Sequence, residues 1–215
     1  MTSSNNTYKR LIAFGASVTF GHGLIDCYNF DTAGSGQTPS RLSWPALVAD
    51  AMNIECDNRA ECGAPNLKIL LNVLSADTCT ADLVIILWNI SDLSILFDDV
   101  GEIIRLGPNE KNQMHLCKEF YMAHSEYDLS VRTLLDIGHS TNYLENKNVT
   151  VYNFYNDENL HNFIAGAALP LPLTGSIRYL DASVNLDQGL DGIHPGPLSH
   201  AAIADLILTH IRTDK

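Results

Sequence analysis

The sequence predicts one α/β domain in which helices cover both faces of a mainly parallel, doubly wound sheet of about five strands. Short apolar runs alternate along the chain with segments of helical periodicity, as expected for such a three-layer fold. The chain has 215 residues, of which 46% are hydrophobic and 18% are charged, so it can build one sizeable core. We therefore expect a single domain over residues 9–215, after a disordered polar tail at residues 1–8.

Three runs in the first half of the chain are strand candidates. "RLIAF" at residues 10–14 is short and apolar and ends at Gly15. "IECDNRA" at residues 54–60 is a second candidate. "ADLVIILWNI" at residues 81–90 is the clearest, because a continuously apolar run is typical of a strand covered on both faces of a parallel sheet.

Helical segments are expected next to these strands. The stretch 43–53 starts with Ser43 as an N-cap and has Pro45 in its first turn, which is a helix-start signature. Residues 67–75 carry apolar side chains at helical spacing, and residues 116–144 are expected to form one long helical stretch.

The second half of the chain is less regular. Residues 94–113 have no clear period and are expected to form an insertion or lid. "VTVYNFYN" at residues 149–156 is a further strand candidate, and residues 157–190 are expected to be irregular. The closing segment 199–211 has an apolar stripe at helical spacing, and His200 is expected on the surface of that helix.

The charge of the chain restricts its partners. The formal net charge is -12 and the sequence pI is about 4.9, so neither nucleic acid nor an anionic membrane is expected as a partner. The first ten residues lack the apolar segment of a signal peptide. We therefore expect synthesis in the cytoplasm, although a virus- or phage-encoded protein could act elsewhere. Nothing in the sequence indicates the oligomeric state.

The cysteines do not indicate a metal site. Their number is odd and no two of them form a C-x-x-C pair, so neither a zinc site nor a disulfide framework is expected. Reduced, mostly buried thiols are the expectation for all five: Cys27, Cys56, Cys62, Cys79 and Cys117. We expect no cofactor and no metal.

Several chemically capable residues follow the predicted strands. Ser17 follows the first strand, Gly63 follows the second, and residues 89–92 follow the third. Because the carboxyl ends of parallel strands meet at one edge of a doubly wound sheet, we expect these residues to lie close together.

A further candidate stretch, "DGIHPG" at residues 191–196, precedes the last helix. Asp191 and His194 are three positions apart on a turn, so the carboxylate can hold one imidazole nitrogen and leave the other free to take a proton. A serine hydroxyl is a weak nucleophile that needs such a base. Ser17, His194 and Asp191 would then be nucleophile, base and orienting group.

Acyl transfer also requires donors to the oxyanion. The backbone N–H groups of Ser17 and Gly63 are candidates, and a substrate could approach Gly63 closely because glycine has no Cβ. A side chain at the end of the third strand would complete the oxyanion hole.

The sequence resembles the SGNH/GDSL hydrolases, because four short blocks occur in the order that is typical of that family. "FGASVTFGHG" resembles the first block with Ser17 as nucleophile, "NRAECG" resembles the second with Gly63 as the oxyanion glycine, and "DLVIILWNISD" resembles the third. "DGIHPG" resembles the last block, with Asp191 and His194 as the dyad that serves Ser17. The stretch 42–66 is similar to phage-encoded and bacterial members. The resemblance implies a flavodoxin-like α/β/α sandwich.

Two positions depart from the pattern of the family. Ala16 stands where the first block has an Asp that is not a member of the triad. Alignment on Asp92 places Ser91 where the oxyanion Asn belongs, and Asn89 could serve instead if the strand ends differently. The third oxyanion donor is therefore either Asn89 or Ser91, or it is missing.

The resemblance implies a cofactor-independent serine hydrolase that cleaves an acetyl ester on a carbohydrate or a short-chain acyl ester. The alternative is a catalytically degraded member that serves as a glycan-binding or structural module. A phosphate or nucleotide binder is disfavoured, because "GASVTFGHG" matches neither glycine-rich phosphate motif and no Lys follows. His22 is expected only to line the loop after Ser17.

Overall fold

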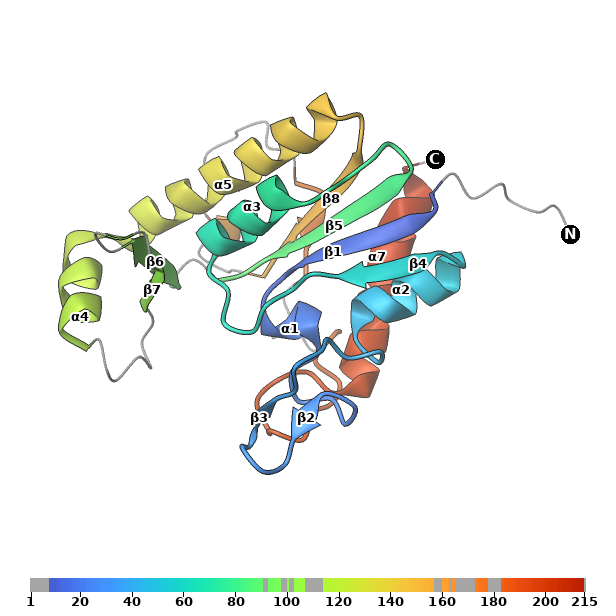
Figure 1. The fold of residues 1–215 in the computed structure, drawn as a ribbon, viewed down its shortest axis with the longest axis horizontal. Helices are drawn as coiled ribbons and strands as arrows, with labels where there is room; N and C mark the ends of the chain where they lie inside the picture. Colours follow the sequence, from blue (N-terminus) through green and yellow to red (C-terminus); the bar gives the residue numbers. More distant parts are fainter. Residues whose placement is uncertain are drawn as a thin grey trace, which may run out of the picture.

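The computed structural model confirms the predicted fold class. Its central sheet has five strands in the order β4-β1-β5-β8-β9, and each neighbouring pair is parallel. Helices lie on both faces of the sheet (Figure 1). The structure describes residues 8–90, 93–97, 100, 103–106, 114–156, 160–162, 164, 173–177 and 183–214. Of the tail expected at residues 1–8, residues 1–7 lie outside this described part.

The strands follow the predicted runs closely. The sheet consists of β1 (Arg10–Gly15), β4 (Glu55–Asn58), β5 (Asp82–Trp88), β8 (Thr150–Tyr155) and β9 (Gly175–Ser176). All seven residues of β5 are buried, as its continuously apolar sequence predicts for a central strand. The short strand β9 lies within the stretch that was expected to be irregular, and it pairs with the end of β8.

Alternate residues of each central strand pack on opposite faces of the sheet, because successive side chains of a strand point in opposite directions. Leu11 and Ala13 contribute to a core with helices α2 (Trp44–Met52) and α7 (Pro197–Thr213). Ile12 and Phe14 contribute to a second core with α3 (Asn66–Ser75) and α5 (Glu126–Asn146). Burial on both faces explains why these strands are apolar throughout.

The insertion expected at residues 94–113 includes an antiparallel hairpin. Its strands are β6 (Ser94–Phe97) and β7 (Ile103–Leu106), and they form a sheet separate from the central one. A second small hairpin, β2 (Tyr28–Asn29) with β3 (Gly34–Ser35), follows the short helix α1 (Ser17–Phe20).

The long helical stretch expected at residues 116–144 is divided into two helices. Two helices, α4 (Met114–Ala123) and α5, occupy this stretch and meet at His124 and Ser125. The Ser125 side chain accepts a hydrogen bond from the Asp128 backbone N–H and so caps the start of α5. A serine at this position stabilises a new helix start instead of the middle of a longer helix.

Two expectations about individual side chains are wrong. Cys56 and Cys79 are exposed, whereas Cys27 and Cys117 are buried, and no disulfide joins the five cysteines, all of which the structure describes. His200 is fully buried in α7 instead of lying on its surface. Within the described residues, no helix has both the length and the apolar character that crossing a membrane requires.

Candidate active site

Ser17 lies where the first strand gives way to a short helix. β1 ends at Gly15, and Ser17 is the first residue of α1. Ala16 between them is buried in the core that faces α3 and α5, where a carboxylate would lose its hydration. The hydroxyl of Ser17 therefore lies at the carboxyl edge of the sheet, where sites form in doubly wound folds.

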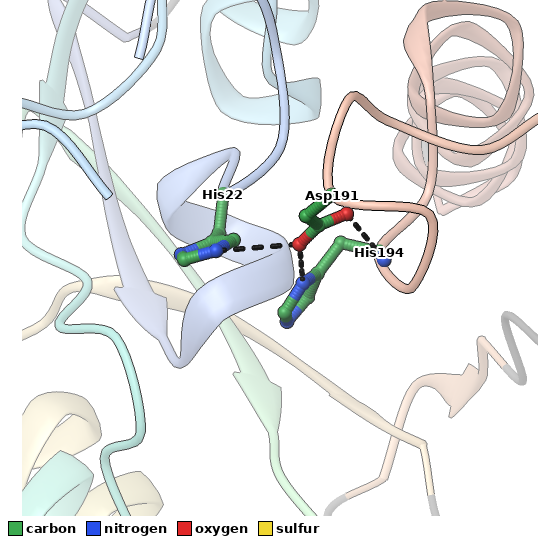
Figure 2. A group of neighbouring side chains, drawn as sticks. All are labelled: His22, Asp191 and His194. Atoms are coloured by element: carbon green, nitrogen blue, oxygen red, sulfur yellow. Dashed lines mark hydrogen bonds and ion pairs between the residues drawn. The ribbon is translucent and has the colours of Figure 1, made fainter. Parts of the chain in front are cut away.

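The structure brings His194 to Ser17 although the two residues are 177 positions apart in the chain. The Nε2 atom of His194 lies 2.9 Å from Ser17 Oγ, and its Nδ1 atom lies 2.5 Å from Asp191 Oδ2. Figure 2 shows the Asp191 carboxylate directed at the His194 ring. Serine, histidine and aspartate are thus in contact in the order expected for a nucleophile, a base and the group that orients the base.

The Asp191 carboxylate is held from several sides. Its Oδ1 atom accepts hydrogen bonds from the backbone N–H groups of Ile193 and His194 at 3.1 and 3.0 Å. Burial by itself raises the pKa of Asp191, but the hydrogen bonds from the His194 ring and from these two N–H groups outweigh burial and hold the pKa below its usual value. Asp191 is therefore ionised at neutral pH and can orient an imidazole.

The turn that carries Asp191 and His194 is fixed to the start of α7. Asp187 accepts hydrogen bonds from the backbone N–H groups of Leu198 and Ser199, at 3.1 and 2.8 Å, and so caps this helix from outside. The Gly189 N–H donates to the carbonyl oxygen of His194 at 2.8 Å. His194 is therefore held by its own turn and by the helix that follows.

The two backbone oxyanion candidates have N–H groups that are available. Within the part of the chain that the structure describes, neither the Ser17 N–H nor the Gly63 N–H donates to a protein acceptor. Gly63 is exposed and has a φ of 70°, a left-handed conformation that favours glycine. Both N–H groups can therefore donate to a ligand atom that reaches them.

Asn89 directly follows β5 and lines a small cavity together with Ser17. Its side-chain amide donates to the Ala64 carbonyl oxygen at 2.9 Å, and its Oδ1 accepts from the Ile90 N–H at 2.9 Å. One of the two amide hydrogens is thus engaged, and the other can serve as a donor. The alternative candidate, Ser91, lies outside the described residues.

Asn66 is a site residue that the sequence did not indicate. Its Oδ1 accepts from the Asn89 N–H at 2.8 Å, and its Nδ2 donates to the Asn89 carbonyl oxygen at 3.0 Å. The buried Asn66 side chain therefore clamps the backbone of Asn89 from the first turn of α3. The only signal in the sequence is the position of Asn66 shortly after Gly63.

The cavity beside Ser17 has a volume of about 10 Å³ and is lined by Leu87, Trp88 and Asn156 as well as by Ser17 and Asn89. A larger apolar cavity of about 390 Å³ lies between α3, β6, α4 and α5. This larger cavity includes Asn66 in its lining but neither Ser17 nor His194, so we do not assign the chemistry to it.

His22 has a contact that the sequence did not predict. Its Nε2 atom lies 3.3 Å from Asp191 Oδ2, and the centre of its ring lies 4.5 Å from that of His194. On the other side of the ring, Nδ1 contacts the Ser35 hydroxyl, which lies 3.0 Å from Cys62 Sγ. Figure 2 shows the His22 and His194 rings directed at the same oxygen of the Asp191 carboxylate.

A metal ion at this cluster would compete with existing hydrogen bonds. Among the described residues, His22, Asp191 and His194 offer ligand atoms that all lie within 4.8 Å of one another. Asp191 Oδ2 and His194 Nδ1 are only 2.5 Å apart, so a metal ion would have to replace the hydrogen bond between them. As the side chains lie, the hydrogen bond between Asp191 and His194 therefore disfavours a metal ion at this cluster.

Several solved structures are similar to this chain. An acetyl xylan esterase, Est2A, from the rumen bacterium Butyrivibrio proteoclasticus has a TM-score of 0.56 and 14% identity over 96% of this chain and 64% of its own. A family two carbohydrate esterase from Clostridium thermocellum, solved with cellohexaose, has a TM-score of 0.58 and 12% identity over 100% and 66%. TesA has a TM-score of 0.53 and 11% identity over 95% and 99%.

Neither a family model nor a curated protein matches the sequence. The chain spans about two thirds of the length of the two carbohydrate esterases. At these identities, the likeness to solved structures extends to the fold.

Proposed function

The chain has the fold of the SGNH/GDSL hydrolases, and from this premise we propose that it is a serine ester hydrolase that works through an acyl-enzyme. The observation that carries the proposal is the chain of contacts from Ser17 Oγ to His194 Nε2, at 2.9 Å, and from His194 Nδ1 to Asp191 Oδ2, at 2.5 Å. This geometry provides a nucleophile, a base within reach and a group that holds the base.

In the proposed reaction, Ser17 Oγ attacks the ester carbonyl while His194 Nε2 accepts the hydroxyl proton. Asp191 keeps the proton of the ring on Nδ1 and stabilises the imidazolium that forms. His194 then gives the proton to the departing alcohol, which leaves an acyl group on Ser17. A water molecule, activated by His194 in the same way, releases the acid and restores the serine. The reaction so written needs no cofactor.

The tetrahedral intermediate carries its negative charge on the former carbonyl oxygen. We assign the backbone N–H groups of Ser17 and Gly63 as two donors to this oxygen, because both are available in the described structure. Asn89 is the third donor in this proposal, since it lines the same cavity as Ser17 and retains an amide hydrogen. Each such donor typically contributes about 100-fold to 1000-fold in rate.

The proposed substrate is a small ester, either an acetyl ester on a carbohydrate or a short-chain acyl ester. Two observations support a small acyl group. The cavity beside Ser17 has a volume of only about 10 Å³, close to the space that one water molecule needs, so it has no room for a long acyl chain. In addition, two of the similar structures are carbohydrate esterases, one of them described as an acetyl xylan esterase. The net charge of -12 also favours an uncharged substrate over a polyanion.

Covalent labelling tests the proposal directly. A fluorophosphonate probe should label the protein, and peptide mapping should place the label on Ser17. Ser17→Ala and His194→Ala should abolish both labelling and hydrolysis of p-nitrophenyl acetate. Ser75→Ala is a matched control, since Ser75 is an exposed serine at the end of α3 and should leave both unchanged.

The substrate class is tested separately. Acetylated oligosaccharides and p-nitrophenyl esters of increasing chain length should be compared, with rates falling steeply beyond short acyl groups. A folded wild-type protein that is neither labelled nor active would favour the binding or structural module over the enzyme. Equal slow hydrolysis by wild type and both variants would lead to the same conclusion.

A further inference from the structure

One oxygen of the Asp191 carboxylate contacts two histidine rings, and among the described side-chain contacts it is the His194 ring that reaches the Ser17 hydroxyl. Its Oδ2 atom is 2.5 Å from His194 Nδ1 and 3.3 Å from His22 Nε2. The side chain of Asp191 is only 8% exposed, so water contributes little to holding it. The His22 ring is therefore in a position to restrain the same carboxylate oxygen that His194 contacts.

The hydrogen-bonding pattern around His22 determines which of its nitrogens carries hydrogen. Nε2 faces a carboxylate, which accepts hydrogen bonds and cannot donate them when ionised. Nδ1 faces the Ser35 hydroxyl, which also contacts Cys62 Sγ. The hydroxyl has one hydrogen and can give it either to Cys62 Sγ or to His22 Nδ1.

Only one of these two arrangements suits a neutral ring. If the hydroxyl donates to the sulfur and Nδ1 donates to the hydroxyl, a neutral Nε2 directs its lone pair at the Asp191 carboxylate. The Cys62 Sγ atom also lies 3.7 Å from His22 Nδ1, so the thiol can instead donate to Nδ1 directly, which leaves the ring hydrogen on Nε2. If the hydroxyl donates to Nδ1, the Cys62 thiol donates to the hydroxyl and the His22 Nε2–H donates to Asp191. Every contact in this second arrangement joins a donor to an acceptor.

The charge state of His22 supports the second arrangement. Burial is the largest influence on His22 and lowers its pKa, and the neighbouring His194 lowers it further, whereas Asp191 opposes both. The ring is therefore neutral at pH 7. A neutral second ring also avoids placing a positive charge 4.5 Å, centre to centre, from the imidazolium that forms on His194 during the reaction.

We propose that His22 is a positioning residue of this site: as a neutral ring with its hydrogen on Nε2, it donates to Asp191 Oδ2 and fixes the carboxylate that orients His194. The effect on catalysis rests on the function proposed above, but the assignment of the hydrogen does not. A series of contacts joins Cys62, next to Gly63, through Ser35 and His22 to Asp191, and Asp191 Oδ2 accepts hydrogen bonds from the His22 ring and from the His194 ring.

Two substitutions of similar size distinguish the role of His22 Nε2 from that of His22 Nδ1. In His22→Gln the amide can occupy the place of Nε2 and donate to Asp191, whereas in His22→Asn the shorter amide occupies the place of Nδ1 and leaves Asp191 without this donor. We expect His22→Asn to lower kcat by about 10-fold to 100-fold with little change in KM, and His22→Gln to keep most of the wild-type kcat. Thermal melting of both variants serves as the check on folding.

Nitrogen-15 NMR of the histidine rings in the wild-type protein provides a readout that needs no turnover. The signals of His22, assigned by comparison with His22→Gln, should show a neutral ring with hydrogen on Nε2. A ring with its hydrogen on Nδ1 would overturn the proposal. Equal kcat values for His22→Asn and His22→Gln would also overturn it, whether both values match the wild type or both are reduced. If the wild type proves inactive on esters, the proposed function fails, and the NMR result still decides the state of His22.

Discussion

The backbone N–H of Leu190 donates a hydrogen bond to the carbonyl oxygen of Gly23 at 2.7 Å, and this bond joins the loop after Ser17 to the loop that carries His194. The two loops come from opposite ends of the chain, and at this point their backbones meet directly, because Gly189 lies against Gly23. The distance between Ser17 and His194 therefore depends in part on this contact of backbone with backbone.

A methyl group at Gly189 should separate the two loops. The added Cβ of Gly189→Ala would lie 2.8 Å from the carbonyl oxygen of Gly23 and 2.9 Å from its carbonyl carbon, so the backbone has to move. We expect kcat for ester hydrolysis to fall by about 10-fold to 100-fold, because small displacements of reacting groups are costly. Gly138→Ala in α5, where an added Cβ meets no atom within 4 Å, is the control and should keep full activity. Wild-type kcat in Gly189→Ala would contradict the prediction.

The cap of α7 should contribute to stability. Removal of the Asp187 carboxylate in Asp187→Ala leaves the Leu198 and Ser199 N–H groups without their acceptor. We expect a loss of about 1–2 kcal/mol in the free energy of unfolding, measured by urea denaturation at pH 7. Asp187→Asn retains one acceptor oxygen and should lose less. The prediction would be refuted if Asp187→Ala had the same urea midpoint of unfolding as the wild type.

The third oxyanion donor can be assigned by two parallel substitutions. If Asn89 donates to the oxyanion, Asn89→Ala should lower kcat by about 100-fold to 1000-fold, and Ser91→Ala should have little effect. Loss of the bond from Asn89 to the Ala64 carbonyl should lower stability by only about 1 kcal/mol, so a folded protein is expected. The reverse pattern of kcat values would assign the role to Ser91. Wild-type kcat in both variants would mean that two backbone donors suffice.

His200 should make the protein less stable in mild acid. Burial lowers the pKa of His200 to about 4, whereas the unfolded chain has the ordinary value near 6.5. Between these two values the unfolded state binds a proton that the folded state does not, so stability falls as the pH is lowered from about 6.5 to about 4. The loss attributable to His200 is on the order of 3 kcal/mol.

His200→Asn is the matched variant for this effect. The asparagine oxygen can accept the hydrogen bond that His200 Nδ1 now accepts from the Trp44 N–H at 3.2 Å, and the amide does not titrate. We expect the melting temperature of the wild type to fall more steeply across this pH range than that of the variant. Because the pKa of His22 is also lowered, the melting temperature should still fall with decreasing pH in both proteins, but less steeply than the wild-type curve to which His200 contributes. Parallel curves would show that His200 is not responsible.

The sequence by itself determined the layers of the fold and the residues in contact with Ser17. Runs such as residues 81–90 are apolar throughout because both faces of a central strand are covered, and this burial leaves a pattern within the strand itself. Asp191 and His194 were recognisable because they are three residues apart on one turn, and because Ser17 follows a strand. Signals of this kind depend on neighbours in the chain, so they can be read without a structure.

Only the tertiary structure decided which distant side chains touch. The contacts of His22 with Asp191 and of Asn66 with Asn89, together with the burial of His200, depend on how loops and helices pack. None of these three residues differs in its local sequence from a loop, cap or surface residue. Their partners are 23 or more positions away, and short-range periodicity carries no information about pairs at such separations.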